Sequence, residues 1–168
     1  QFMRSRNVSF QASSINAYTR YYPSLDSNRQ IDIIPKLLEI SMVSGVFEVG
    51  ETVEGFVGNE RVISFRVASQ DHKSGPYDAL STDLTSSSRF YSSNPYDNPI
   101  ISPLSGYNAS SSVLNVDLDS LCREVIGEFS GRVEVGMTLL GTTSGAEATL
   151  LRNRLISDND GQVLGSFF

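Results

Sequence analysis

Short runs of alternating apolar and polar residues cover much of the chain, and glycine, serine, asparagine and proline separate them. Val8, Phe10 and Ala12 alternate with polar neighbours, which predicts a half-buried strand. Other apolar-rich runs that predict strands lie at 19–22, 31–43, 62–67, 148–156 and 162–168. Pro35 lies inside the run 31–43 and favours an edge strand there, because proline cannot donate a ladder hydrogen bond. The pattern predicts a mainly β protein.

One stretch occurs twice and organises this pattern. Residues 44–55 and 130–141 both fit S-G-x-[FV]-E-V-G-x-T-[VL]-x-G, at a spacing of 86 positions (131 minus 45). A longer apolar run follows each copy after a further glycine, so each copy predicts a small β-meander. The glycines allow tight changes of chain direction. The repeated glycines are Gly45, Gly50 and Gly55 in the first copy, and Gly131, Gly136 and Gly141 in the second.

Period-two alternation inside the repeat predicts which side chains are buried. Phe47 and Val49 fall on one face of an extended segment, as do Val133 and Val135 in the second copy. The glutamates between them fall on the outer face, where a solvated role is favoured over a role as general acid. The repeat is therefore interpreted as scaffold.

A change of period predicts one short α-helix within residues 113–129. Asp117 fits the N-cap and Gly127 the end of this helix. Cys122 on its apolar side is interpreted as core packing rather than as a nucleophile. The positions that follow the i, i+3, i+4 spacing are Leu118, Leu121, Cys122, Val125 and Ile126.

These elements predict antiparallel meanders in a β-sandwich or barrel-like arrangement, with one short helix and a long polar insertion. The chain order is N-terminal strands in 1–43, the first meander in 44–70, the insertion in 71–112, the helix in 113–129, and the second meander with a C-terminal strand in 130–168. The parts are expected to form one compact unit, a fragment of a longer chain.

The insertion at 71–112 is rich in Ser, Asn, Asp and Pro, yet it also carries aromatic residues. Long segments without periodicity are often functional, and spaced aromatic rings can bind a carbohydrate or a protein. The alternative, which we favour, is that the rings hold an irregular loop against the sheets. The aromatic residues in question are Tyr77, Phe90, Tyr91, Tyr96 and Tyr107.

Composition narrows the function classes. The 168 residues carry a formal charge of −6, which argues against nucleic acid and anionic membranes as partners, since both require clusters of Lys and Arg. No apolar run has the length of a membrane span, so we expect no membrane insertion. The single cysteine, Cys122, excludes an intrachain disulfide.

No motif for catalysis or cofactor binding stands out. His72 is the only histidine, and no G-x-S-x-G elbow, phosphate-binding glycine loop or H-E-x-x-H accompanies it. Residues 158–161 read D-N-D-G, which resembles part of a calcium loop. A turn with Gly161 at positive φ explains them more simply. These motifs therefore assign no catalytic, cofactor-binding or metal-ligating residue, and a pair of carboxylates facing a cleft, as in glycoside hydrolysis, stays an open alternative.

Several blocks of the sequence resemble virion structural proteins of tailed phages, notably those of marine cyanobacterial myoviruses. Residues 2–10 (FMRSRNVSF) with 19–22 (TRYY) are similar to an F-M-R-S-R-x-[IV]-x-F…T-R-x-Y signature of that family, and residues 72–77 (HKSGPY) resemble its H-K-x-G-P-Y segment. Residues 113–117, 136–149 and 157–168 are also similar. Residues 25–27 (LDS) depart from the aromatic-Asp-Gly turn of the relatives, which affects the expected conformation of that loop.

The resemblance implies a non-enzymatic component of the tail, baseplate or fibre that acts in particle assembly. Its implied partners are other virion proteins, and its implied location is the virion tail. By analogy with fibres, a homotrimer is compatible with this interpretation. The alternative is a receptor- or carbohydrate-binding module of a tail fibre, in which the 71–112 loop contacts a host surface glycan.

Overall fold

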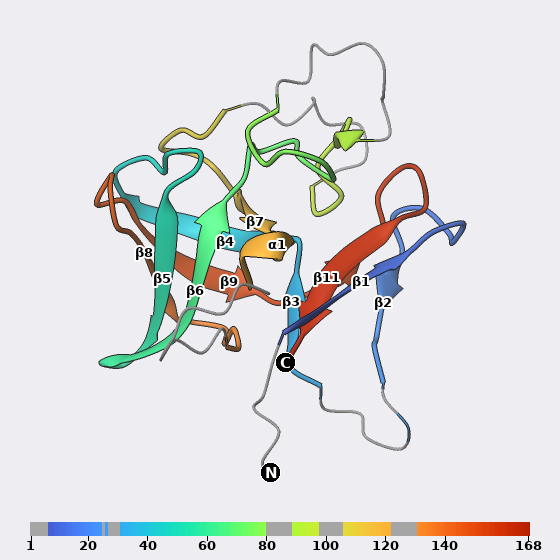
Figure 1. The fold of residues 1–168 in the computed structure, drawn as a ribbon, viewed down its shortest axis with the longest axis horizontal. Helices are drawn as coiled ribbons and strands as arrows, with labels where there is room; N and C mark the ends of the chain where they lie inside the picture. The colour runs from blue at the N-terminus through green and yellow to red at the C-terminus, as the bar shows by residue number, and fades with distance from the viewer. Residues whose placement is uncertain (1–6, 25, 27–30, 80–88, 98–105, 122–130) are drawn as a thin grey trace.

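The computed structural model describes residues 7–24, 26, 31–79, 89–97, 106–121 and 131–168, and it is mainly β, as predicted (Figure 1). A single helix, α1 (Leu118–Leu121), lies among the described residues. The strands are β1 (Val8–Ala12), β2 (Arg20–Tyr21), β3 (Ile33–Pro35), β4 (Leu37–Ser44), β5 (Thr52–Val57), β6 (Glu60–Val67), β7 (Val113–Asp117), β8 (Thr138–Gly141), β9 (Glu147–Arg152), β10 (Leu155–Ile156) and β11 (Val163–Phe167).

Six of the strands close into an antiparallel barrel in the order β4-β7-β6-β5-β8-β9. Closure removes the exposed strand edges that an open sheet would leave. The barrel is filled by one apolar cluster to which every barrel strand contributes, including Leu38, Val53, Phe65, Val116, Leu139 and Leu150. The barrel-like alternative of the prediction is therefore the observed one.

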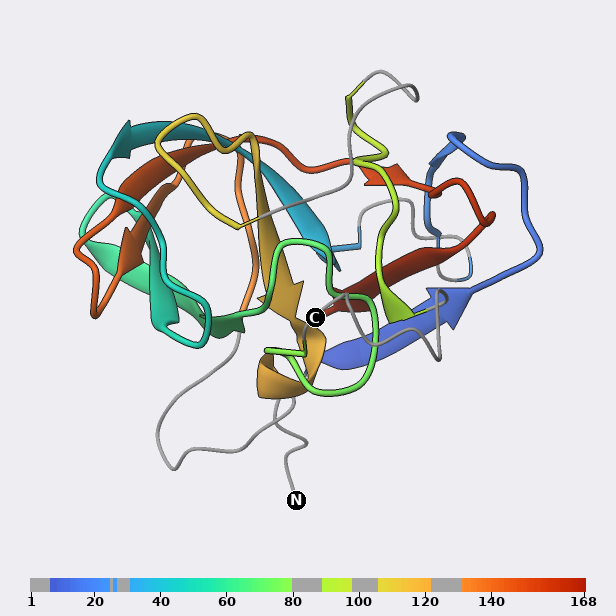
Figure 2. The same cartoon turned by 90° about the horizontal axis from the view of Figure 1, so that it is seen from above.

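A smaller three-stranded sheet of order β1-β11-β3 lies beside the barrel, with the β10-β2 pair next to it (Figures 1 and 2). It brings the first and last described strands together, because Val8 pairs with Phe167. The edge-strand prediction for the run 31–43 is correct only for β3, which carries Pro35 at the sheet edge. β4 pairs on both sides, with β7 and β9, because Lys36 takes the chain from one sheet into the other.

The two repeat copies are related by an approximate two-fold axis that passes through the barrel wall. β5 of the first copy pairs with β8 of the second, Val53 facing Gly141 and Gly55 facing Leu139. Glu54 and Leu140, which occupy equivalent positions in the two copies, face each other at the centre. Each copy then forms a hairpin, β5–β6 or β8–β9. The repeat in the sequence is thus a repeat in the fold.

The middle glycine of each copy makes the same turn. Gly50 has φ of 90° and donates from its N–H to the Val67 carbonyl at 2.8 Å. Gly136 has φ of 88° and donates in the same way to Leu150, also at 2.8 Å. Such φ values favour glycine. The turn therefore starts the hairpin at the same place in both copies.

The predicted strand ahead of this turn does not form, so the alternation argument was wrong at one position in each copy. Phe47 and Val133 are buried, but Val49 is 43% exposed and Val135 is 65% exposed. The reason is the turn itself: the N–H of Glu51 bonds back to the Glu48 carbonyl at 3.2 Å, which rotates Val49 away from the core.

The first glycine of each copy packs against the other copy. A Cβ on Gly45 would lie 2.9 Å from the Cα of Ala146. Ala146 directly precedes β9, the second strand of the second hairpin. A Cβ on Gly131 would overlap the carbonyl oxygen of Val62 in β6. These close approaches leave no room for a side chain. The two copies are therefore held together by reciprocal glycine contacts as well as by the β5–β8 ladder.

The helix begins where predicted, immediately after Asp117, but residues 113–117 before it form β7 rather than part of a helical segment. The expected helical positions Cys122, Val125, Ile126 and Gly127 lie outside the described residues. Residues 158–161 form the expected turn, in which Gly161 has φ of 67° and its N–H bonds to the Asp158 carbonyl at 3.1 Å.

We predict that Gly131→Ala lowers the free energy of unfolding by at least about 2 kcal/mol, because the new methyl group would displace the β6 backbone. Gly106→Ala is the matched control, since the position that its Cβ would occupy has no atom within 4 Å. Urea denaturation followed by circular dichroism measures both. Equal stability of the two variants would contradict the contact between the copies.

Candidate functional site

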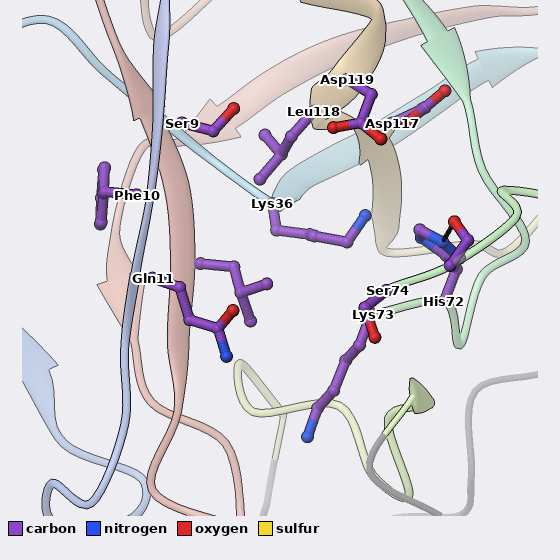
Figure 3. Close-up of a pocket in the computed structure, with 12 residues that line it drawn as sticks. Ser9, Phe10, Gln11, Lys36, His72, Lys73, Ser74, Asp117, Leu118 and Asp119 are labelled. Carbon is purple, nitrogen blue, oxygen red and sulfur yellow. Dashed lines mark hydrogen bonds between the residues drawn. The ribbon is translucent and has the colours of Figure 1, made fainter. Parts of the chain in front are cut away.

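A polar cavity of about 270 Å³ lies where the barrel meets the β1-β11-β3 sheet (Figure 3). It collects buried side chains that bear amine, imidazole and carboxylate groups, together with hydroxyl and amide groups from β1 and the 71–112 insertion. The residues that line it are Ser9, Phe10, Gln11, Lys36, His72, Lys73, Ser74, Gly75, Asp117, Leu118, Asp119 and Leu164.

Lys36 is fixed at the junction of the two sheets. Its N–H donates to the Leu164 carbonyl at 3.1 Å, and its own carbonyl accepts from the N–H of Val116 at 2.8 Å. The side chain is only 2% exposed. Its Nζ donates to Asn115 Oδ1 at 2.7 Å and to the Val116 carbonyl at 2.6 Å. Burial lowers the pKa of Lys36 to about 7, although the negative charges of Asp117 and Asp119 oppose the shift.

Asn115 reaches the same place because of strand alternation. Leu114 and Val116 point into the barrel core, so Asn115 and Asp117 of β7 point outward, toward the smaller sheet. Asn115 is fully buried. Its Nδ2 donates to the Gln70 carbonyl at 3.1 Å and to the His72 carbonyl at 2.8 Å. The carboxamide is therefore held in one orientation.

His72 lies beside this pair and is 4% exposed. Its Nε2 bonds to the Gly75 carbonyl at 3.0 Å. A carbonyl only accepts, so this contact places the proton on Nε2 and leaves a lone pair on Nδ1. Nδ1 is buried without a hydrogen-bond partner in the part of the chain that the structure describes. Burial, followed by the nearby charge of Lys36, lowers the pKa of His72 to about 4, so the ring is neutral at neutral pH.

Three ion pairs, formed by the two cations Arg66 and Lys73, close the site. Arg66 binds the Asp117 carboxylate through Nε at 2.8 Å and Nη2 at 2.5 Å. The same guanidinium stacks on the Tyr77 ring, with its Cζ 3.8 Å from the ring centroid. Lys73 points away from Lys36 (Figure 3) and pairs with Asp158 at 2.5 Å and Asp160 at 3.0 Å. The Lys73 ion pairs attach the H-K-x-G-P-Y segment to the β10–β11 turn. The Tyr77 ring attaches the segment to Arg66 of β6, which is itself paired with Asp117 of β7.

The predicted aromatic positions of the insertion contact the chain itself. Phe90 and Tyr91 are buried, and the Tyr91 ring centroid lies 5.3 Å from Lys73 Nζ. Tyr96 donates from its hydroxyl to the Arg154 carbonyl at 2.8 Å. Tyr107 donates to the Ala68 carbonyl at 2.8 Å. Burial raises the pKa of Tyr91, Tyr96 and Tyr107.

These contacts agree with the favoured interpretation, in which the rings hold an irregular loop against the sheets. Presenting Tyr91, Tyr96 or Tyr107 to a glycan would require the segment to leave the barrel. Tyr77 is half-buried and its ring lies against Gly50, the turn glycine of the first repeat copy. The repeat glycines themselves lie in the barrel and its turns, not in the cavity.

Sequence reasoning singled out His72 but missed Lys36 and Asn115. Lys36 stands inside the apolar stretch 33–38 (IIPKLL), and Asn115 stands inside the apolar stretch 113–116 (VLNV). A long charged or amide side chain in the middle of a buried strand is rare unless it is paired, and this was the available signal.

No protein-family model, curated protein or solved structure matches this chain. Among the described residues, no helix is long and apolar enough to cross a membrane, and no cluster of three or more His, Cys, Asp or Glu side chains is arranged to hold a metal ion. Two groups that line the cavity can take part in chemistry, the Lys36 amine and the neutral His72 imidazole with its lone pair. The Asn115 carboxamide lies beside the amine, with its Oδ1 2.7 Å from Lys36 Nζ.

We predict that the free energy of unfolding rises with pH between 4 and 6.5 through His72. In this range the unfolded ring binds a proton and the folded ring does not, because its pKa falls from 6.5 to about 4 on burial. The full effect is about 3 kcal/mol. Urea titrations of the wild type and of His72→Gln across this range measure it. Parallel pH profiles of the two proteins would contradict the assignment.

Proposed function

We propose that this chain is a non-enzymatic structural module of a tailed-phage virion, located in the tail, baseplate or fibre, and that it acts in particle assembly. The sequence blocks that resemble such proteins support this proposal. So does a scaffold in which a closed barrel is joined to the smaller sheet through the backbone of Lys36 and to the β10–β11 turn through the ion pairs of Lys73. The observation that carries the assembly role is one outer surface of the barrel.

This surface is the outer face of the β4–β9–β8 wall. Alternation turns Ile40, Leu139 and Leu150 inward, where they are buried. It turns the neighbouring positions outward, and Ser41, Thr149 and Thr138 lie side by side across the three strands. The outer face also carries large exposed apolar side chains: Val43 (59% exposed), Leu140 (36%), Leu151 (49%) and, beside the Gly136 turn, Val135 (65%).

Charges are sparse on this face. Glu147, opposite Leu140, and Arg152, at the end of β9, stand at its margins. β5 borders this face, and there Glu54, which faces Leu140 across the β5–β8 ladder, forms an ion pair with Arg61 at 2.6 Å. Interfaces between proteins combine an apolar centre, depleted of charge, with a polar rim. The β4–β9–β8 outer face has this composition, so we propose that it contacts another virion protein.

Immunogold imaging of intact virions, with antibodies raised against this chain, tests the location. Label on the tail, baseplate or fibre is expected. Label confined to the capsid, or protein absent from purified and denatured particles, would contradict the proposal. Analytical ultracentrifugation of the intact protein tests the homotrimer, and a stable monomer would count against it.

A surface variant tests the assembly role. We predict that Val43→Glu combined with Leu151→Glu reduces incorporation into particles by at least about tenfold, because two buried charges without partners weaken a protein interface strongly. Both side chains are exposed, so we expect thermal stability to change little. Asn59→Glu, at the β5–β6 turn on another part of the barrel, is the control. Quantitative blots of purified virions compare the three proteins.

A further inference from the structure

The amine of Lys36 and the carboxamide of Asn115 face each other with almost no exposure to bulk water. Lys36 is 2% exposed and Asn115 is fully buried. The Lys36 Nζ lies 2.7 Å from Asn115 Oδ1, which puts it no more than about 3.9 Å from the carbonyl carbon Cγ, given a C=O bond of about 1.23 Å. Reacting atoms in a near-attack arrangement are about 3–3.5 Å apart. The attack therefore requires Nζ to move closer to Cγ by less than about 1 Å.

We propose that Lys36 and Asn115 form an intramolecular isopeptide bond that joins the β3–β4 junction covalently to β7. In this step the lone pair of Lys36 Nζ attacks Asn115 Cγ, a new Cγ–Nζ bond forms and the Cγ–Nδ2 bond breaks. Nδ2 takes one proton from Nζ and leaves as ammonia. No oxidant, reductant or further reactant is required.

The hydrogen bonds of Lys36 suit the attacking form of the amine. A neutral amine has two N–H groups and one lone pair, whereas an ammonium has three N–H groups and no lone pair. The described residues offer Nζ two acceptors, Asn115 Oδ1 and the Val116 carbonyl. With a pKa of about 7, a large share of the amine carries the lone pair at neutral pH.

His72 is placed to move the proton. Its backbone carbonyl holds Asn115 Nδ2 at 2.8 Å, and its ring lies toward the Lys36 amine (Figure 3). The unpartnered lone pair on Nδ1 accepts the proton that Nζ loses, and the departing Nδ2 receives it. The Asp117 carboxylate, bound by Arg66, adds negative charge near the positive charge that develops on Nζ.

A covalent link here would serve the fold in the way a disulfide does. Lys36 and Asn115 are 79 positions apart, so the bond closes a long loop and restricts the unfolded chain. The single cysteine cannot supply such a link within the chain. The bond would also fix the 71–112 insertion, because Asn115 binds the carbonyls of Gln70 and His72.

Peptide mapping tests the proposal directly. The purified chain is incubated at about pH 8, where most of the amine is neutral, then denatured and digested with trypsin. We expect a branched peptide of residues 30–61 joined to residues 90–123, lighter than the two together by the mass of ammonia, about 17 Da. Trypsin leaves Lys36 uncut in this product. Mapping is needed because a change in intact mass does not show which residues have lost ammonia.

The wild-type digest decides the matter without any variant. Peptides 30–36 and 37–61 together, with no branched product after prolonged incubation, would overturn the proposal. Lys36→Arg is expected to abolish the branched peptide. His72→Gln is expected to slow its formation by at least about tenfold, and the wild-type rate is expected to rise as pH passes through 7. Equal rates for the wild type and His72→Gln would overturn the role of His72. These results do not depend on where the protein lies in a particle.

Discussion

The structure depends on the antiparallel ladder between β5 and β8, in which the two copies of the repeat meet. Each copy alone is a two-stranded hairpin, and isolated hairpins are at most marginally stable in water. When the hairpins pair through β5 and β8, they form a four-stranded sheet whose apolar face is continuous. β4 and β7 then close the remaining gap. The barrel is therefore the smallest unit in which the repeat can bury its apolar positions.

Glu51 shows how this pairing also fixes the loops. Its carboxylate accepts from the N–H groups of Thr143 and Ser144, at 3.1 and 3.0 Å, across the ladder in the other copy. It also accepts from the N–H of Glu48 in its own turn at 2.7 Å. The equivalent position in the second copy is Met137, whose sulfur lies 3.3 Å from the Glu134 N–H. One geometry is thus kept by two different side chains, and only the first reaches the neighbouring loop.

Local sequence patterns correctly predicted the features that depend on a few neighbouring residues, namely hairpins, a helix start and a turn. The repeat located both hairpins, Asp117 located the start of α1, and Gly161 located the last turn. The failures have a common cause. Val49 and Val135 alternate correctly in the sequence, but a turn hydrogen bond two residues later overrides the alternation. β4 was predicted at an edge because Pro35 precedes it, but Lys36 switches the chain to a second sheet. Such a switch depends on long-range pairing that no local pattern contains.

The cavity was harder to predict for the same reason. Lys36, His72 and Asn115 come from segments far apart in the sequence, and each one alone has an ordinary interpretation. Their chemistry depends on their being close together in the folded protein. Burial there lowers the pKa of both the amine and the imidazole. No pattern in a single sequence reports which distant residues are buried together. What the sequence did contain was a lysine in the stretch IIPKLL (33–38) and an asparagine in the stretch VLNV (113–116).

The pairing of β1 with β11 has a consequence for the order in which the chain folds during synthesis. The barrel uses residues 37–152, whereas the smaller sheet cannot form until Val163–Phe167 has been made. Contacts between distant parts of a chain form slowly, because the entropy of closing the loop is lost before the contact stabilises it. The barrel can therefore close first, and β11 then pairs with β1 on one side and with β3 on the other. Until that moment the cavity lacks its β1 and β11 wall, and Lys36 remains accessible to water from that side.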